Sequence, residues 1–138
     1  MSEMPAIYFE THFESTWDLG TAPDEFAIIT AYATTGEQWP EEMNRDADRR
    51  LEIELRKIAP WVHRITGYSP TTGHREPGWA VALGFDDACD TGLRYKQDAI
   101  YMVSGGVLGV SYCDGRRGLV RVGDFGARLR RVEGGSET

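Results

Sequence analysis

Residues 99–112 read Ala-Ile-Tyr-Met-Val-Ser-Gly-Gly-Val-Leu-Gly-Val-Ser-Tyr, and this stretch decides the fold class. Two mainly apolar runs, 99–103 and 107–112, flank the Ser-Gly-Gly of residues 104–106. Paired glycines supply the positive φ angles that a tight turn between antiparallel strands requires. The pattern therefore predicts a β-hairpin.

Other strands are predicted mostly in neighbouring pairs along the chain. Aromatic and β-branched residues indicate strands at residues 6–13, 26–32, 62–68, 78–83 and 119–122. The nearly continuous apolar run at 26–32 is typical of a strand buried on both faces, near the centre of a sheet. Turn-forming residues at 69–73 join the strands on either side of them into a second hairpin. Adjacent strands that pair without intervening helices favour a largely antiparallel sheet.

One main amphipathic helix is predicted at about residues 40–58. Its apolar residues recur every three or four positions and form a single stripe: Met43, Ala47, Leu51, Leu55 and Ile58. Most other positions are charged, so we expect the helix to lie on the sheet with a charged outer surface. A short second helix is predicted at about residues 86–96, with Asp86 as its cap. The predicted fold class is therefore α+β, with a mostly antiparallel sheet and one main helix packed on it.

The composition limits the classes of protein to which the chain can belong. With 138 residues, 41 % of them hydrophobic, residues 1–138 are expected to form a single domain with one core. The formal net charge of −7 disfavours general nucleic-acid binding, because affinity for phosphates comes mainly from clustered cations. No run of about 18 apolar residues is present, so no membrane partner is expected. The N-terminus shows no secretory signal and the two cysteines are interpreted as reduced, so we expect a cytoplasmic protein.

The acidic charge is unevenly distributed along the chain. Residues 1–60 carry 13 acidic against 5 basic side chains, whereas residues 116–131 carry six arginines against Asp124 alone. These arginines belong to a C-terminal extension at 113–132, which is predicted to be a strand or a sheet edge: Arg116, Arg117, Arg121, Arg128, Arg130 and Arg131. Contact of the arginines with nucleic acid is disfavoured, because the acidic residues of 1–60 would repel phosphate.

Two interpretations of this charge segregation remain open. Separated acidic and basic surfaces steer encounters between proteins, which suggests a protein-interaction module or self-association of the extension with the acidic helix. Charges on a strand edge also serve simply to block unwanted pairing of strands.

Motifs for metal or cofactor chemistry are weak in this chain. The sequence Asp-Asp-Ala-Cys-Asp at 86–90 matches the aspartate-rich pattern of isoprenoid synthases, but those enzymes are large and all-helical. His74-Arg75-Glu76 supplies only half of a zinc deaminase signature. A zinc site of His74, Cys89 and Cys113 would form only if the fold brought these three residues, which lie far apart in the sequence, close together. No phosphate-binding glycine loop is present, and we expect neither a metal nor another cofactor.

Several short stretches follow one another in an informative order: 26–32, Asn44-Arg45 with Leu51 and Leu55 downstream, Gly67, Glu76 with Gly78 and Trp79, and 97–101. Together they resemble the domain of unknown function 3293, a family of bacterial proteins. The resemblance covers about residues 6–112 and leaves out the arginine-rich extension. It implies a fold neighbourhood and candidate positions but no activity. The Asn-Pro that follows the family's first strand is replaced here, at residues 33–36.

The polar residues of these stretches are candidate ligand-binding residues: Thr30, Asn44, Arg45, Glu76 and Gln97. If the sheet brings the carboxylate, the guanidinium and the two amides together beside Thr30, they form a small polar cleft. The chain would then be an enzyme or a binding protein for a small polar metabolite, with Glu76 as the candidate general base. Structural roles suit the same side chains, since amides commonly satisfy backbone groups at helix and strand ends. The sequence favours the interaction module, because charge segregation is visible and no nucleophile–base pair is.

Overall fold

The computed structural model describes residues 4–32 and 39–133, so residues 33–36, where the family pattern is replaced, lie outside the described part. The strands are β1 (His12–Ser15), β2 (Glu25–Ile29), β3 (Val62–Tyr68), β4 (Arg75–Val81), β5 (Ala99–Ser104), β6 (Val107–Tyr112), β7 (Val120–Asp124) and β8 (Leu129–Arg131). The helices are α1 (Ile7–Glu10), α2 (Glu41–Ile58), α3 (Phe85–Arg94) and α4 (Phe125–Arg128), with a 3₁₀ turn at Leu19–Thr21.

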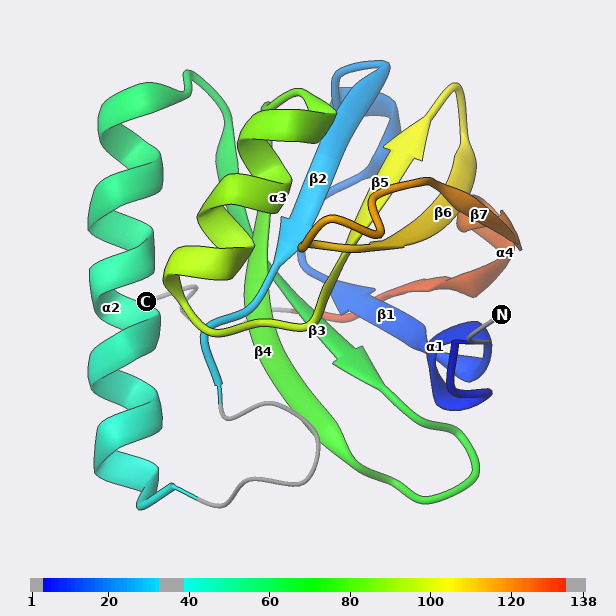
Figure 1. Cartoon of the computed structure of the whole chain (residues 1–138). Coiled ribbons are helices and arrows are strands. Elements are labelled where there is room, and N and C mark those ends of the chain that lie inside the picture. Colours follow the sequence, from blue (N-terminus) through cyan, green and yellow to red (C-terminus); the bar gives the residue numbers. More distant parts are fainter. Residues whose placement is uncertain (1–3, 33–38, 134–138) are drawn as a thin grey trace.

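The strands form one eight-stranded sheet in the order β7-β6-β5-β2-β4-β3-β1-β8. Neighbouring strands in it are antiparallel except β1 and β8, which run parallel. Helices α2 and α3 lie against one face of the sheet (Figure 1). The predicted α+β class, with a mostly antiparallel sheet and one main helix, is confirmed. No helix within the described ranges is long and apolar enough to cross a membrane.

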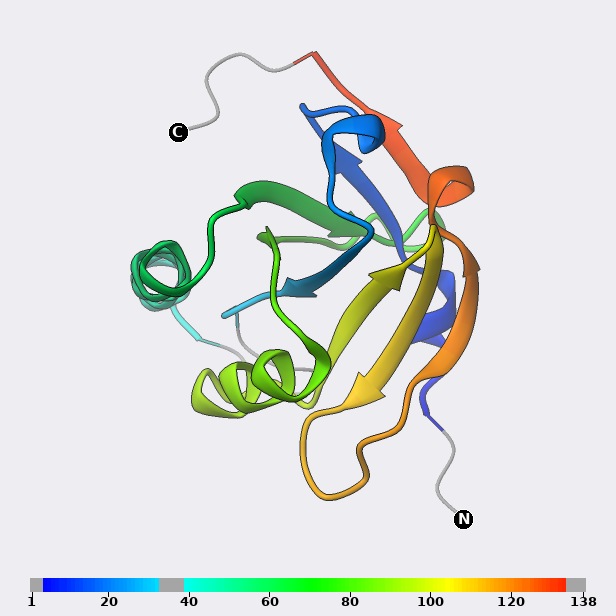
Figure 2. The ribbon, with the colours of Figure 1, turned by 90° about the horizontal axis from the view of Figure 1, so that it is seen from above.

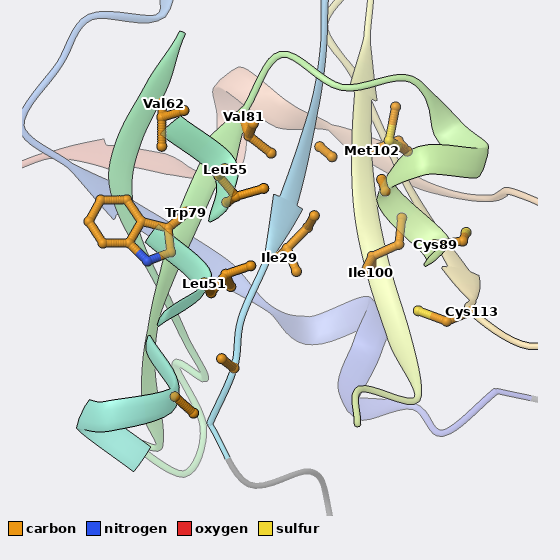
Figure 3. Packing of buried hydrophobic residues seen from close by; sticks show 14 residues of the cluster. Ile29, Leu51, Leu55, Val62, Trp79, Val81, Cys89, Ile100, Met102 and Cys113 are labelled. Atoms are coloured by element: carbon orange, nitrogen blue, oxygen red, sulfur yellow. The ribbon is translucent and has the colours of Figure 1, made fainter. Parts of the chain in front are cut away.

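The sheet is strongly curled, so the face away from the helices is concave (Figure 2). Side-chain alternation along the strands divides the apolar residues into two cores. On β2, Ala27 and Ile29 face the helices, whereas Phe26 and Ile28 face the concave side. The helix-side core includes Leu51, Leu55, Trp79, Val81, Ile100 and Met102 (Figure 3). The concave core includes Phe13, Trp17, Phe26, Ile65, Val103, Leu108 and Phe125.

Both predicted hairpins are confirmed. In the β5–β6 hairpin Ser104 pairs with Val107, and Gly105 and Gly106 adopt φ angles of 55° and 82°. Strand β3 has the predicted bounds and pairs along its whole length with β4. Strand β2 is buried on both faces, between β4 and β5, as its continuous apolar run predicts.

Helix α2 confirms the predicted span, but its buried face is rotated relative to the predicted stripe. Met43 is 47 % exposed and Ile58 53 % exposed, whereas Asp48 is buried. Both carboxylate oxygens of Asp48 accept hydrogen bonds from Arg64, at 2.9 and 2.8 Å, and Trp79 Nε1 donates another at 3.1 Å. A carboxylate with these partners can be buried. Asp48 therefore lies on the sheet-facing side of α2, where the spacing of apolar residues predicted only apolar side chains.

The predicted strand at residues 6–13 is wrong, because helix α1 occupies much of this range and β1 follows it. Tertiary contacts outweigh the β-propensity of the aromatic residues here. The Tyr8 carbonyl oxygen accepts a hydrogen bond from the Tyr101 hydroxyl at 2.8 Å, and the two rings meet edge to face with centroids 6.5 Å apart. The Thr11 hydroxyl donates to the Ile7 carbonyl oxygen at 3.1 Å and closes the turn.

Helix α3 lies within two residues of its predicted span, but Asp86 is not its cap. The N-cap position is Gly84, and Asp86 lies in the first turn, where its charge favours the positive end of the helix. The Asp86 carboxylate instead accepts a hydrogen bond from Arg117 at 3.2 Å.

The C-terminal extension supplies both outermost strands of the sheet. Strand β7 pairs with β6, the chain turns through α4, and β8 lies beside β1 at the other end of the strand order (Figures 1 and 2). Phe125 in α4 is fully buried in the concave core, with its ring centroid 5.6 Å from those of both Phe13 and Phe26. The extension therefore connects the two ends of the curled sheet through a buried aromatic residue.

Candidate functional site

A cavity of about 140 Å³ opens on the concave face beside α1. Its walls come from α1, the end of β2, the β3–β4 hairpin and the start of β5. Phe13, Ile28 and Ile65 provide apolar lining, and Tyr8 and Tyr101 add aromatic rings. A largely apolar cavity with a few polar groups is the usual form of a small-molecule site.

Three of the predicted site residues meet in this cavity. The Thr30 hydroxyl oxygen lies 2.8 Å from Glu76 Oε1 and 3.0 Å from Gln97 Oε1. A hydroxyl carries one hydrogen, so Thr30 donates to one of these two acceptors at a time. The residues come from the end of β2, from β4 and from the segment before β5, and β2 lies between the other two strands in the sheet. The sheet order therefore creates the cluster.

The orientation of Gln97 is fixed by the backbone around it. Its Nε2 donates to the carbonyl oxygens of Tyr32 and Tyr95, at 2.7 and 3.1 Å. Both amide hydrogens are engaged, so the Oε1 atom is the end that faces Thr30. Gln97 thus combines a structural role, holding two loop carbonyls, with an acceptor presented at the cavity.

Glu76 spans the distance from the cavity to the solvent. Its Oε1 contacts Thr30, and its Oε2 lies 3.3 Å from His74 Nε2. The Glu76 side chain is 27 % exposed and that of His74 is 65 % exposed, which places the imidazole at the rim. Each carboxylate oxygen can accept a second hydrogen bond, so Glu76 retains the capacity to bind a ligand.

Two glycines make the room for this arrangement. Glu76 pairs across the strands with Gly67, which lines the cavity and places no side chain next to the carboxylate. At Gly78 an added Cβ would meet Thr30 Cγ2 at 2.7 Å and the Ile29 carbonyl oxygen at 2.8 Å. Any larger residue at position 78 would therefore displace Thr30 from Glu76.

The wall formed by α1 is held by Tyr101. The Tyr101 hydroxyl lies 2.8 Å from the Tyr8 carbonyl oxygen and 2.9 Å from Thr11 Oγ1. Burial raises the pKa of Tyr101 well above its ordinary value, so the hydroxyl remains neutral and acts as a hydrogen-bonding group only. The Tyr101 hydroxyl thus fixes α1 beside the cavity.

Asn44 and Arg45 do not belong to the cavity, which corrects the predicted four-residue cleft. Both lie on α2, which covers the opposite face of the sheet. Asn44 is buried there, and Arg45 is exposed on the outer surface of the helix. The position of Asn44 next to the apolar stripe indicates that it is close to the sheet, but it does not reveal which face of the sheet the helix covers.

Several residues of the cavity were missed from the sequence. His74 immediately precedes β4 and Glu76 lies two positions later, and alternate residues of an extended segment share a face. That spacing could have placed His74 next to Glu76 without any reference to zinc. No comparable signal identifies Tyr8 or Tyr101, because their contribution depends on the packing of α1 against β5. In the described part of the chain, no group of three or more His, Cys, Asp or Glu side chains could hold a metal ion.

The arginines of the extension are largely engaged within the chain. Arg116 binds Asp114, with its closest contact at 2.7 Å, and its guanidinium lies 3.8 Å from the centre of the Tyr112 ring. Arg117 binds Asp90 at 2.6 Å in addition to its contact with Asp86. The contacts of Arg117 attach the segment after β6 to helix α3, whereas the Arg116–Asp114 pair lies within that segment.

Arg128 and Arg131 attach the end of the extension to the N-terminal part of the chain. Arg128 donates to the carbonyl oxygens of Phe9 and Thr11, at 2.9 and 3.1 Å. Arg131 forms an ion pair with Asp18, and Arg121 is exposed on β7. Most of the arginine side chains thus hold the extension in place.

Glu14 on β1 receives a further arginine from the extension. Its carboxylate forms ion pairs with Arg130 of β8 and with Arg75 of β4. Hydrogen bonds from Arg75 and then Arg130 lower the pKa of Glu14 below its ordinary value. Glu14 therefore links β8 to the middle of the sheet through two guanidinium groups.

The family comparison matches the part of the chain that carries the polar cluster. A family model described as a protein of unknown function, DUF3293, matches residues 29–100. This chain belongs to the DUF3293 family. The DUF3293 match runs from the end of β2 to the start of β5 and contains Thr30, Glu76 and Gln97, but it excludes α1 and the extension. A search of curated proteins finds no match.

Proposed function

We propose that this protein binds a small organic molecule in the cavity of the concave face. The observation that carries the proposal is the convergence of Thr30, Glu76 and Gln97 on an otherwise largely apolar cavity. Apolar walls contribute binding free energy by removing ligand surface from water, and a few fixed polar groups set the orientation.

The size of the cavity limits the size of the ligand. Its volume is about 140 Å³. A protein cavity of roughly 150 Å³ holds one benzene ring. The enclosed part of the ligand is therefore about one substituted ring or an equivalent branched chain, and larger molecules would extend past His74 into solvent.

Glu76 is the group through which such a site would act chemically. Its carboxylate lies between a hydroxyl and the cavity opening, so the predicted general-base role of Glu76 belongs to this proposal. Binding alone is the primary proposal, because it needs only the cavity and the polar cluster.

The interaction module predicted from charge segregation is the weaker proposal. The arginine-rich extension was predicted to form its basic surface. The guanidinium groups of the extension, however, mostly bind carboxylates and carbonyl oxygens of the same chain. Paired charges steer a partner less than free ones. The cytoplasmic location proposed with it rests on the two cysteines, which are buried and unpaired with each other.

A fragment screen tests the binding proposal. We expect fragments of about six to ten heavy atoms to shift the amide NMR signals of Thr30, Gln97 and their neighbours, because that size suits a cavity of one ring. Ala99 lines the cavity, so Ala99→Leu should fill it and abolish these shifts. Ala127→Leu adds the same volume at an exposed site and serves as the control. Binding that survives Ala99→Leu in a folded protein would refute the proposal.

A further inference from the structure

The charge around the cavity is strongly one-sided. Of its described lining residues none is lysine or arginine, whereas Glu76 contributes a carboxylate and Asp98 lies exposed at the rim. His74 is the one titratable group there that can carry positive charge, and it is mostly exposed to water.

Two arginines on segments that adjoin the cavity, Arg75 and Arg128, bind other groups of the chain. Arg75 precedes Glu76 on β4, but strand alternation directs it to the opposite face of the sheet, where it binds Glu14. Arg128 lies near α1, and its guanidinium donates to the carbonyl oxygens of Phe9 and Thr11. Neither side chain forms an ion pair with Glu76, and in residues 4–32 and 39–133 this carboxylate has no guanidinium partner.

Hydrogen-bond acceptors outnumber donors in the polar cluster. Among the described residues, the two oxygens of Glu76 and the Oε1 of Gln97 contact two side-chain donors, the Thr30 hydroxyl and the His74 ring nitrogen. The amide hydrogens of Gln97 are already used by backbone carbonyls. An ammonium group carries several hydrogen-bond donors on one atom. A ligand with such a group would satisfy the remaining hydrogen-bonding capacity of these acceptors.

The aromatic lining favours the same kind of ligand. Tyr8 and Tyr101 present rings in the cavity, and aromatic rings attract cations through the negative potential of their faces. An anionic ligand would meet the carboxylate of Glu76, and no lysine or arginine among the described lining residues would offset the repulsion.

We infer that the cavity selects a small organic cation, a primary amine carried on an aromatic or branched apolar group. The ammonium group contacts Glu76 and the Oε1 of Gln97, and the apolar part lies against Phe13, Ile28 and Ile65. This inference rests on the proposed function, because it names the ligand class of the same cavity.

Three probes with one ring and different charge test the inference: benzylamine, benzyl alcohol and benzoate. The titrations are made at about pH 8, where primary amines are charged. We expect benzylamine to bind about tenfold or more tightly than benzyl alcohol, because its ammonium group forms an ion pair with Glu76 where the alcohol donates one hydrogen bond from a neutral hydroxyl. Benzoate should bind more weakly than either.

Variants of Glu76 identify the group responsible. Glu76→Gln keeps the shape and removes the charge, so benzylamine affinity should fall about tenfold and benzyl alcohol affinity should fall by a much smaller factor. Glu76→Asp, which retains the charge at a shorter reach, should give an intermediate value and guards against a folding defect in the glutamine variant. Glu25→Gln, at an exposed site at the start of β2, is the control and should change neither affinity.

The outcomes separate the two proposals. If benzyl alcohol or benzoate binds at least as tightly as benzylamine, or if Glu76→Gln leaves benzylamine affinity unchanged, the cation inference is wrong and the cavity still binds ligands. If fragments of every charge fail to shift the cavity signals, the proposed function itself is wrong.

Discussion

Asp48 and Glu76 are carboxylates on opposite faces of one sheet, and their negative charges have different partners. Asp48, on the helix side, binds both nitrogens of the Arg64 guanidinium end and the Trp79 indole nitrogen. Glu76, on the concave side, contacts a hydroxyl and an exposed imidazole. A carboxylate that the fold fully satisfies is structural, whereas one that retains free acceptor capacity beside a cavity is a candidate for binding. The surroundings of these two residues, rather than residue type, distinguish the roles.

The largest expected effect tests whether the concave core depends on the extension. Phe125→Ala should lower the free energy of unfolding by about 3–5 kcal/mol, because it empties the space between Phe13 and Phe26. Leu119→Ala removes an exposed apolar side chain from the same extension and should cost less than about 0.5 kcal/mol. Urea denaturation measures both. Equal losses for the two variants would show that Phe125 does not hold the concave core together.

The comparison of the two carboxylates gives the next largest effect. Asp48→Ala leaves Arg64 and the Trp79 indole without their partner and should cost about 2–3 kcal/mol. Glu76→Ala should cost less than about 1 kcal/mol, because the Thr30 hydroxyl can still donate to Gln97. The measurement is urea denaturation at neutral pH. A loss at Glu76 as large as that at Asp48 would assign Glu76 a structural role and contradict the distinction between them.

The smallest expected effect is the contribution of Glu14 to the pH dependence of stability. Glu14 is a third carboxylate, and it forms ion pairs with two arginines. Its folded-state pKa is lowered below the ordinary value of 4.5 by hydrogen bonds from Arg75 and Arg130. This pairing therefore stabilises the protein fully above the unfolded-state pKa, and the contribution is lost as the pH falls through the folded-state pKa. Glu14→Gln should flatten the dependence of stability on pH below about 4.5 and lower stability at neutral pH. Thermal unfolding of the two proteins across the acid range provides the check, and parallel curves would contradict the assignment.

Local sequence signals predict the elements whose periodicity is strong. The hairpin at 99–112, the span of α2 and the bounds of β3 follow from glycine placement, a period of three to four, and alternation. Helix α1 and strand β8 could not be found in this way, because each is held by distant partners. Tyr101 fixes α1, and Glu14 fixes β8 through Arg130.

The candidate site was predictable only in part, for a similar reason. Thr30, Glu76 and Gln97 meet because β2 lies between β4 and β5, and this order is a property of the whole sheet. Asn44 was assigned to the cleft by its distance from the apolar stripe of α2. That distance gives a position around the helix but contains no information about which face of the sheet the helix covers.

The parallel pairing of β1 with β8 has a consequence for the order in which the protein can fold during synthesis. The helix-side core uses residues that precede β7, so it can form as soon as β6 has emerged from the ribosome. The concave core needs Phe125, and β1 gains its second neighbour only when β8 follows. Until then Phe13 and Phe26 lack their contacts with the Phe125 ring, and an edge of the sheet next to an apolar surface is open to other chains. A chain interrupted before position 125 would therefore have an incomplete concave core, and the aromatic residues of that core would be accessible to chaperones and proteases.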